Sequence, residues 1–416
     1  MFDPFADFVL GHTDHGVPVY SLSVPQCEFA YISIIFHVGA YHDPAQKAGL
    51  AHFLEHMVCA NDGLETSSRA RFYSALGGSY HAFTSYFATW YGFCLPTATD
   101  QFDQALAQWF GATLGGRLTA HFAREQSVIE SEIRRKYPSM QHMDMATSLN
   151  SAIYRDTQWS RAPSPAGTVA SVQMFQLHDV RELHQRTYTI DNMSVVCVGG
   201  LSAEQVLAKV QKALTPHIHR RGERCAPVTG SVVTPPPLQT KLVYNTANGA
   251  ASSGVDVLLS SMLPAAIEYE QTSIVATALS QILLQKLRDE RGLVYNTRAM
   301  VNNCVAFNTL TLVAQNFTAP EVDEVLSILR AVLDSLTTLT AEVEEAKAAS
   351  LQRYAMYDPR WQGIHSAAVN DVTMYGRIIS RQHDYDVAAR MNVVDTLGSL
   401  QPFVANDYTV TSVHYK

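Results

Sequence analysis

The sequence repeats one strand–helix arrangement, once in each half of the chain. A β-branched and aromatic run at 29–38 precedes a helical pattern at 50–57, and a similar run at 255–259 precedes a helical pattern at 279–286. The two helical patterns share their leucine spacing, but the two histidines of the first are glutamines in the second. This matching order indicates two related α+β domains, of which the first carries the polar chemistry.

A proline-containing stretch separates the two copies. Residues 216–240 include three consecutive prolines at 235–237 and have the composition of a linker. We therefore expect a first domain at 1–215, a linker at 216–240 and a second domain at 241–416.

Composition argues against several classes of protein. Hydrophobic residues make up 47% of the 416 residues, enough for a large core without disulfides or a structural metal. The net charge of −8, from 30 basic and 38 acidic side chains, argues against a dedicated nucleic-acid-binding protein. Six dispersed cysteines without a C-x-x-C pair favour reduced, buried thiols. Because no signal-peptide pattern and no apolar run near the ~18 residues of a membrane span are present, we expect a cytoplasmic protein without a membrane partner.

The first helical pattern contains the segment His52-x-x-Glu55-His56. Positions i and i+4 lie on the same face of a helix, so the two imidazoles can bind one metal ion. Glu55 is close enough to act on the open position of that ion, which is the arrangement of metal-assisted hydrolysis by zinc. The alternative is an amphipathic helix with two incidental histidines.

A polar helix expected at 120–136 supplies the carboxylates for a third ligand. Glu125 and Glu132 are seven residues apart and share one face, whereas Glu130 points elsewhere. Catalytic zinc sites with two histidines need a third protein ligand, often a carboxylate. The alternative is a solvated helix with Glu–Arg pairs.

These segments together resemble the pitrilysin/insulysin and mitochondrial-processing-peptidase zinc peptidases, the inverzincins. In that family H-x-x-E-H is followed about 76 residues later by a glutamate, and Glu132 lies 132 − 56 = 76 positions after His56. The surrounding Glu-x-x-Val-Ile-x-x-Glu context also matches. The resemblance implies one Zn²⁺ per chain on His52, His56 and Glu132, with Glu55 as general base and Glu125 supporting the ligands.

A second match covers the segment 77–84, which is similar to the family's Gly-Gly-x-x-Asn-Ala-x-Thr strand. That strand lies along the substrate in the family, which implies substrate contacts by His81, Ala82, Phe83 and Thr84. His81 replaces the usual asparagine. We expect this exchange to change the polarity or the specificity of the cleft.

The second half contains Leu287–Tyr295, similar to the family's Leu-Arg-x-x-x-Gly-Leu-x-Tyr segment. The resemblance implies that Arg288 and Tyr295 meet the substrate near the zinc. An arginine can hold a peptide carbonyl, and a tyrosine can donate to a developing oxyanion. The alternative is that Arg288 pairs with Asp289 or Glu290 and that Tyr295 only packs.

The resemblance also implies a fold and an assembly. The chain is similar to the half-length branch, with the mitochondrial processing peptidase β subunit and bacterial homologues. It implies two homologous α/β-sandwich domains of the metallopeptidase LuxS/processing-peptidase-like fold, each a mostly antiparallel sheet covered by helices. Because the halves of longer members close like a clamshell, we expect a homodimer with two shared active sites. A heterodimer with an inactive sibling subunit is the alternative.

The expected function is zinc-dependent endopeptidase activity on peptides or unfolded segments inside a closed dimeric chamber. One alternative is a non-catalytic core or scaffold subunit. Another is a dedicated maturation protease in a heterodimer. A carbon–sulfur lyase that shares H-x-x-E-H is disfavoured, because it needs a cysteine as third ligand and a much shorter chain.

Overall fold

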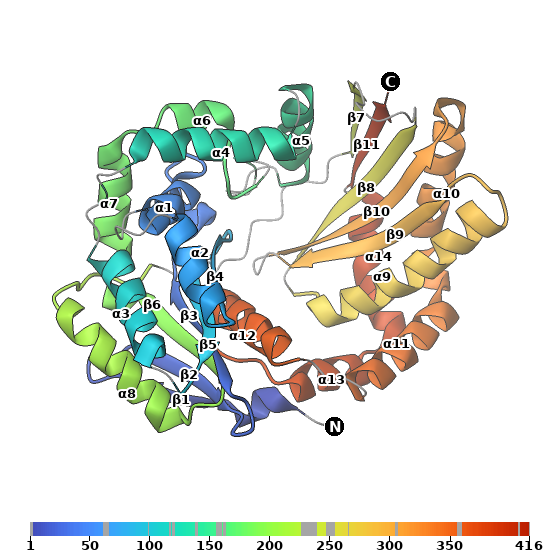
Figure 1. Cartoon of the computed structure of the whole chain (residues 1–416). Helices are drawn as coiled ribbons and strands as arrows, with labels where there is room; N and C mark the ends of the chain where they lie inside the picture. The colour runs from blue at the N-terminus through green and yellow to red at the C-terminus, as the bar shows by residue number, and fades with distance from the viewer. Residues whose placement is uncertain are drawn as a thin grey trace.

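The computed structural model shows a molecule built from two sheets, each with its own set of helices (Figure 1). It describes residues 3–415, apart from 61–65, 99, 116–117, 119–120, 138–139, 155–159, 161–163, 226–238, 247–253, 265, 304–306, 356–359 and 407. Within the described residues no helix is both long enough and apolar enough to cross a lipid bilayer.

The first sheet has six strands in the order β1-β2-β6-β3-β5-β4, and only the β2–β6 pair is parallel. Its central strands β3 and β6 are almost fully buried because they are β-branched and apolar. The strands are β1 (Val9–His12), β2 (Pro18–Ser23), β3 (Phe29–Phe36), β4 (Ser79–Thr84), β5 (Thr89–Pro96) and β6 (Met193–Gly199).

Helices α1, α3, α7 and α8 contribute to the hydrophobic core that covers one face of this sheet. Phe53 and Leu54 of α1 and Phe110 of α3 are completely buried there against Ile32 and Ile34 of β3. The helices of the first half are α1 (Leu50–Ala60), α2 (Thr66–Ala75), α3 (Asp100–Leu114), α4 (Phe122–Lys136), α5 (Met140–Ile153), α6 (Val169–Gln173), α7 (Leu177–Thr187) and α8 (Ala203–Leu214).

The second sheet has the order β7-β11-β8-β10-β9, with β7 and β11 as its parallel pair. Its strands are β7 (Gln239–Thr246), β8 (Val255–Pro264), β9 (Asn296–Asn303), β10 (Phe307–Phe317) and β11 (Tyr408–Tyr415). The helices of the second half of the chain are α9 (Tyr269–Leu283), which continues as a π-helical turn (Leu284–Asp289), α10 (Val322–Asp334), α11 (Thr340–Ala355), α12 (Trp361–Tyr375), α13 (Arg381–Arg390) and α14 (Val393–Asn406).

The two sheets share one topology. The sequence β3-α1-β4-β5 of the first half corresponds to β8-α9-β9-β10 of the second, and the strands occupy the same relative places in both sheets. The predicted α+β class, with two mostly antiparallel sheets covered by helices, is therefore confirmed. The division at 1–215, 216–240 and 241–416 stays a prediction, because residues 226–238 of the expected linker lie outside the described residues.

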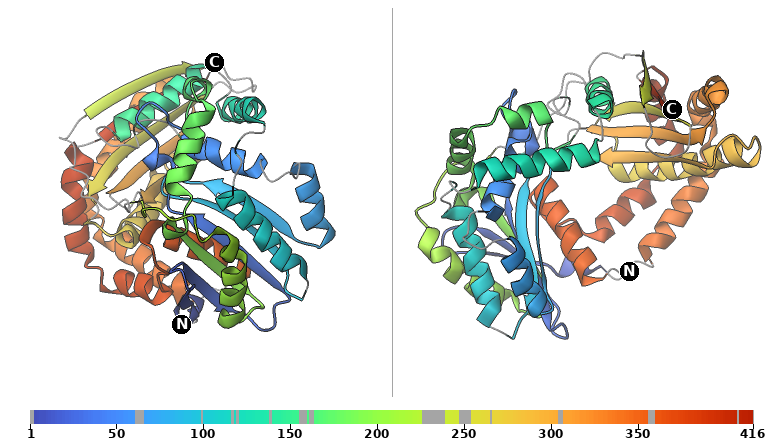
Figure 2. Two further views of the ribbon diagram at one scale, coloured as in Figure 1. Left: turned by 90° about the vertical axis from the view of Figure 1, so that its left-hand side faces the viewer. Right: turned by 45° about the horizontal axis from the view of Figure 1, so that its top comes forward.

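Each sheet is also covered by one helix from the other half of the chain. Helix α5 lies against β7, β8 and β11, whereas α12 lies against β3 and β6 (Figures 1 and 2). Ile364, Ala368 and Val372 of α12 form a separate hydrophobic cluster with Ile35 and Val196. The two halves therefore exchange helices, which the strand–helix repeat did not predict.

The cysteines agree with a reduced protein. The five described ones are free thiols; Cys94 and Cys197 are buried, and Cys27, Cys59 and Cys225 are half-buried. Cys304 lies outside the described residues.

Candidate metal and active site

The site is built on α1, whose first turn is fixed by a buried acid. The carboxylate of Asp43 accepts hydrogen bonds from the backbone N–H groups of Gly49 (2.7 Å) and Ala51 (2.8 Å). The first amides of a helix otherwise lack partners, and a carboxylate also suits the positive end of the helix dipole. On the fixed helix, His52 and His56 lie one turn apart with ring centroids separated by 4.8 Å.

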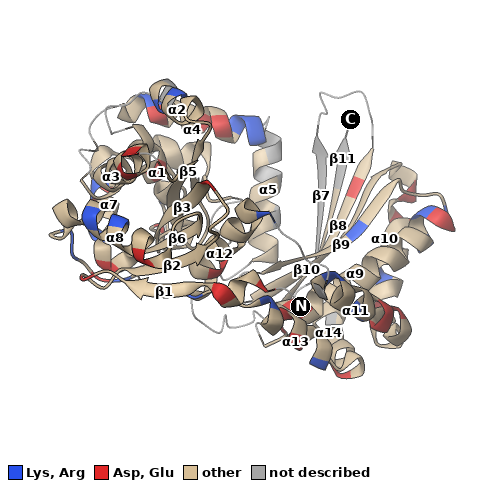
Figure 3. Cartoon of the chain, turned by 60° about the horizontal axis from the view of Figure 1, so that its bottom comes forward, with Lys and Arg blue, Asp and Glu red and all other residues tan. Residues whose placement is uncertain are grey.

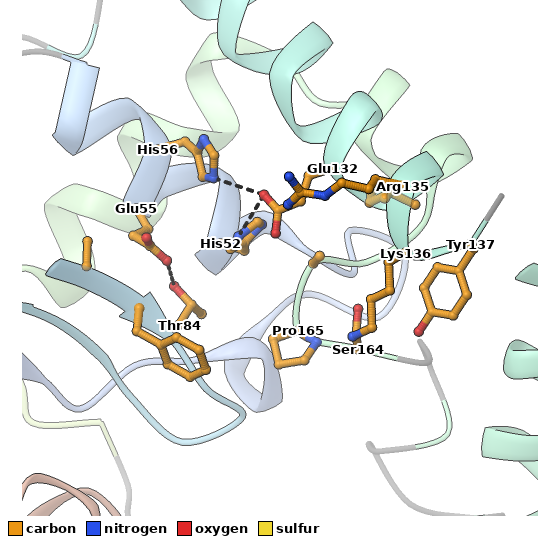
Figure 4. Close-up of a pocket in the computed structure, with 14 residues that line it drawn as sticks. His52, Glu55, His56, Thr84, Glu132, Arg135, Lys136, Tyr137, Ser164 and Pro165 are labelled. Carbon is orange, nitrogen blue, oxygen red and sulfur yellow. Dashed lines mark hydrogen bonds and ion pairs between the residues drawn. The ribbon is translucent and has the colours of Figure 1, made fainter. Parts of the chain in front are cut away.

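Glu132 of α4 meets both imidazoles (Figure 4). Its Oε2 lies 3.9 Å from His52 Nε2 and 3.5 Å from His56 Nε2, and one donor atom from each residue lies within 4.8 Å of the other two. A tetrahedral zinc ion with bonds of about 2.1 Å holds its ligand atoms about 3.4 Å apart. Two imidazoles and one carboxylate at this spacing fit a catalytic zinc centre that leaves one position open.

The electrostatics of the three residues favour a positive charge between them. Burial lowers the pKa of His52, which keeps that ring neutral as a metal ligand must be. Burial also lowers the pKa of His56, but hydrogen bonds to Glu125 and Glu132 outweigh it and raise that pKa to about 9. The two carboxylates thus stabilise a cation at this point, which a divalent metal ion supplies as well as a proton.

Glu125 contacts His56 at Nδ1, the ring nitrogen that does not face Glu132. His56 Nδ1 lies 3.3 Å from Glu125 Oε2, while Arg124 Nε (3.0 Å) and Nη2 (2.9 Å) donate to Glu125 Oε1. A carboxylate behind a ligating histidine fixes the ring orientation and the tautomer. This geometry matches the supporting role that the family resemblance implies for Glu125.

Glu55 is buried beside the two histidines and accepts a hydrogen bond of 2.7 Å from Thr84 Oγ1. Burial raises the pKa of Glu55, and the Thr84 hydrogen bond acts in the opposite direction. A carboxylate with a raised pKa is a suitable general base near neutral pH. The sequence predicted Thr84 only as a substrate contact, and its hydrogen bond to Glu55 was missed.

A cavity of about 390 Å³ opens beside these groups. This volume lies within the range of small-ligand sites. Besides His52, Glu55, His56 and Glu132, the cavity is lined by Ala82, Phe83 and Thr84 of β4, by Ile133, Arg135, Lys136 and Tyr137 around the end of α4, and by Ser164, Pro165 and Ala166.

His81 belongs to the same strand β4 but has a different environment from the three residues that follow it. Ala82, Phe83 and Thr84 line the cavity, but His81 does not. Its Nε2 lies 3.1 Å from Ser33 Oγ, and its ring packs edge-on against His365 of α12. The histidine that replaces the family's asparagine therefore contributes to the contact between β4 and α12 and not to the lining of the cavity.

Arg288 and Tyr295 also lie outside this cavity. Arg288 belongs to the π-helical turn after α9, and Tyr295 directly precedes β9. The Arg288 guanidinium lies 5.2 Å from the centre of the Tyr295 ring, and Tyr295 is 76% exposed. The two predicted substrate-binding residues are therefore paired with each other on the surface and are not brought to the metal ligands of the same chain.

The basic residues of the cavity were not among the predicted site residues. Arg135 and Lys136 follow Glu132 by three and four positions, so the helical period was a signal that both share its face. Arg124, which binds Glu125, carried no comparable signal, because adjacent helix residues do not normally face one another.

Sequence profiles of two families match this chain. Residues 19–164 match the insulinase family (peptidase family M16), and residues 175–350 match the peptidase M16 inactive domain. The chain belongs to peptidase family M16. Its pitrilysin-type, half-length character, predicted from the motifs, is confirmed.

Relatives and solved structures agree with this assignment. An uncharacterized zinc protease of Mycobacterium leprae is 27% identical over 297 residues, which cover 68% of this chain and 63% of that protein. The chain thus spans less than two thirds of the length of such M16 relatives. The peptidase M16 inactive domain from Pseudomonas fluorescens has the same fold (TM-score 0.82, 14% identity, 98% of each chain covered). The first half of the periplasmic protease PqqL from Escherichia coli is also similar (TM-score 0.76, 17% identity, 98% of this chain and 92% of that one).

Proposed function

We propose that the chain is a zinc-dependent endopeptidase of family M16 that hydrolyses peptides or unfolded segments. The observation that carries this proposal is the convergence of His52, His56 and Glu132 beside the buried Glu55, at the wall of a cavity. The names of the relatives as zinc proteases support the metal and the reaction class.

The residues divide the hydrolysis between them. His52, His56 and Glu132 hold Zn²⁺, which when bound supplies Lewis acidity toward a peptide carbonyl and the attacking water. Glu55 accepts the proton of that water and later donates it to the leaving amine. Thr84 keeps the Glu55 carboxylate oriented through its hydrogen bond, and Glu125 keeps His56 oriented.

The edge strand β4 offers a place for an extended substrate. It pairs with β5 on one side only among the described strands, so its outer backbone edge is available to a peptide. Peptides commonly add to such an edge as a further strand. Ala82, Phe83 and Thr84 of this strand line the cavity, which would bring a peptide bond next to the metal ligands.

We further propose that two copies form a closed chamber with shared sites. Arg288 and Tyr295 are exposed and lie outside the cavity of their own chain, so a second copy can present them to it. The similarity of this chain to one half of PqqL supports such a pairing. A heterodimer with an inactive sibling, in general peptide turnover or in precursor maturation, is the competing assembly. The cytoplasmic location stays a prediction.

Replacing Glu55 by glutamine tests the function. Glu55→Gln removes the base but no metal ligand, so we expect one zinc per chain and a loss of peptide cleavage of about 10²–10⁴-fold. Zinc is measured by elemental analysis, and cleavage on a peptide library with and without a chelator. Undiminished cleavage by Glu55→Gln would refute the assignment, and a wild-type chain without zinc-dependent cleavage would favour the scaffold alternative.

A further inference from the structure

The cavity at the candidate active site has a basic wall. Arg135 and Lys136, in the last turn of α4, line it beside Glu132 (Figure 4). Residues three and four positions after Glu132 share its helix face, which directs both cations to the side of the metal ligands. Figure 3 shows the same basic end of α4 next to α5.

Within the described residues, no carboxylate neutralises these two cations, although the Lys136 ammonium lies 5.6 Å from the centre of the Tyr137 ring. Arg134, the third cation of the turn, lies outside the cavity and pairs with Glu130 at 3.6 Å. Arg135 and Lys136 form no ion pair within 4 Å with any carboxylate of the described residues. The negative end of the helix dipole accounts for only about half a unit charge.

Both cations act on the ligands from a distance. The lowered pKa of Glu132 comes first from its hydrogen bond with His56, and Arg135 adds to it. The lowered pKa of His52 comes first from burial, and Lys136 adds to it. A zinc ion at this centre would be balanced by the carboxylates of Glu132 and Glu55. Two positive charges would then remain uncompensated at the cavity wall.

We propose that Arg135 and Lys136 bind a carboxylate of the peptide substrate, close to the scissile bond. This inference rests on the proposed peptidase function. The arginine fork can bind both carboxylate oxygens, and the lysine adds a point charge. The carboxylate comes either from an aspartate or glutamate side chain or from the C-terminus of the peptide.

Binding to the Glu55→Gln chain tests the proposal without turnover. The probes are fluorescent decapeptides around a bond that the wild type cleaves, in which one glutamate replaces glutamine at each of the six flanking positions in turn. Each peptide is made with a free and an amidated C-terminus. Affinity is measured by anisotropy, at a zinc content verified for every variant.

We expect glutamate at one flanking position to strengthen binding about tenfold over glutamine. In an Arg135→Gln/Lys136→Gln background this preference falls below twofold, whereas Arg134→Gln, from the same turn, retains it. Arg135→Glu/Lys136→Glu reverses it, so that glutamine binds better than glutamate at that position. A preference that follows the free C-terminus identifies the terminal carboxylate as the group bound.

Equal binding of all peptides, or a preference that survives the double glutamine variant, would overturn this inference alone, provided that the wild type still cleaves the peptides. An absence of zinc-dependent cleavage in the wild type would overturn the proposed function and this inference together.

Discussion

Three acids in the second half, of which Asp384 is buried and Glu270 and Asp371 are half-buried, lower the stability of the fold at neutral pH. Glu270, Asp371 and Asp384 line a second cavity, of about 470 Å³, between α9, α12 and α13. Burial raises the pKa of all three carboxyl groups, and it raises that of Asp371 to about 6. Asp371 also accepts a hydrogen bond of 3.0 Å from the backbone N–H of Ile379.

Asp371→Asn is therefore expected to stabilise the protein at pH 7. A carboxyl whose pKa is raised on folding stabilises the fold below its unfolded value of 3.8 and loses that contribution as the pH rises through about 6. Asparagine retains the acceptor without the charge, so we expect a gain of about 2–3 kcal/mol at pH 7 that falls below about 1 kcal/mol at pH 4. The difference in the free energy of unfolding between the variant and the wild type is measured by denaturant unfolding from pH 4 to 8. A gain that does not change with pH would contradict the titration of Asp371 as its cause.

At the level of single residues, sequence spacing predicted part of the candidate site. The separations of His52, His56 and Glu132 indicated a ligand set because helix period and family pattern agree on them. The partner of a side chain across the fold is not encoded in local spacing. The hydrogen bond from Thr84 to Glu55 depends on which face of β4 meets α1, and the contact of His81 with His365 depends on a helix nearly 300 residues later.

Among the elements, α1 is held at its start by a residue outside itself. Asp43 lies seven residues before the helix begins, yet its carboxylate binds two of the first backbone amides. The helical pattern at 50–57 was predicted, but the contact of this helix with Asp43 was not. The intervening chain, which brings Gly49 and Gly167 into close backbone contact, was not predicted.

Asp43→Ala is expected to loosen the first turn of α1. Two buried hydrogen bonds to a charged acceptor would be lost, at a cost of about 2–3 kcal/mol. Since His52 lies in that turn, zinc affinity should also fall. Thermal unfolding and competition with a chelator measure the two effects, with Asp14→Ala, an exposed acid, as control. Equal behaviour of the two variants would contradict the anchoring role of Asp43.

The other helices and strands were predicted well where one face, or the whole element, is buried in the core. The expected strand at 29–38 corresponds to β3, and the expected helices at 50–57 and 120–136 correspond to α1 and α4. The helical pattern expected at 279–286 changes to a π-helical turn after Leu283. Apolar periodicity does not report such a change in backbone hydrogen bonding.

For the whole molecule, the exchange of α5 and α12 was beyond sequence reasoning. Local patterns gave the two copies of the strand–helix unit, but which sheet an amphipathic helix covers is decided by long-range packing. The assembly of two chains is likewise a property that one chain suggests only through the exposed pair Arg288 and Tyr295.

Mixing two inactive variants tests the shared sites. His52→Ala removes a metal ligand and Arg288→Ala removes the substrate-binding arginine. If each site takes its arginine from the other copy, a mixed dimer contains one site with both residues intact and one with neither. We expect each variant alone to be inactive and an equimolar mixture to recover up to about one quarter of wild-type activity. Persistent inactivity of a mixture shown to exchange subunits would count against shared sites.

The exchange of helices has a consequence for synthesis of the chain on the ribosome. The last strand of the first sheet ends at Gly199, but its cover α12 begins only at Trp361, 361 − 199 = 162 positions later. At about 5–20 residues per second this delay lasts roughly 10–30 s. During that time the apolar surface around Ile35 and Val196 is available to chaperones. Nascent chains stalled near residue 300 should accordingly be cleaved by protease in the first half, whereas released full-length chains should resist.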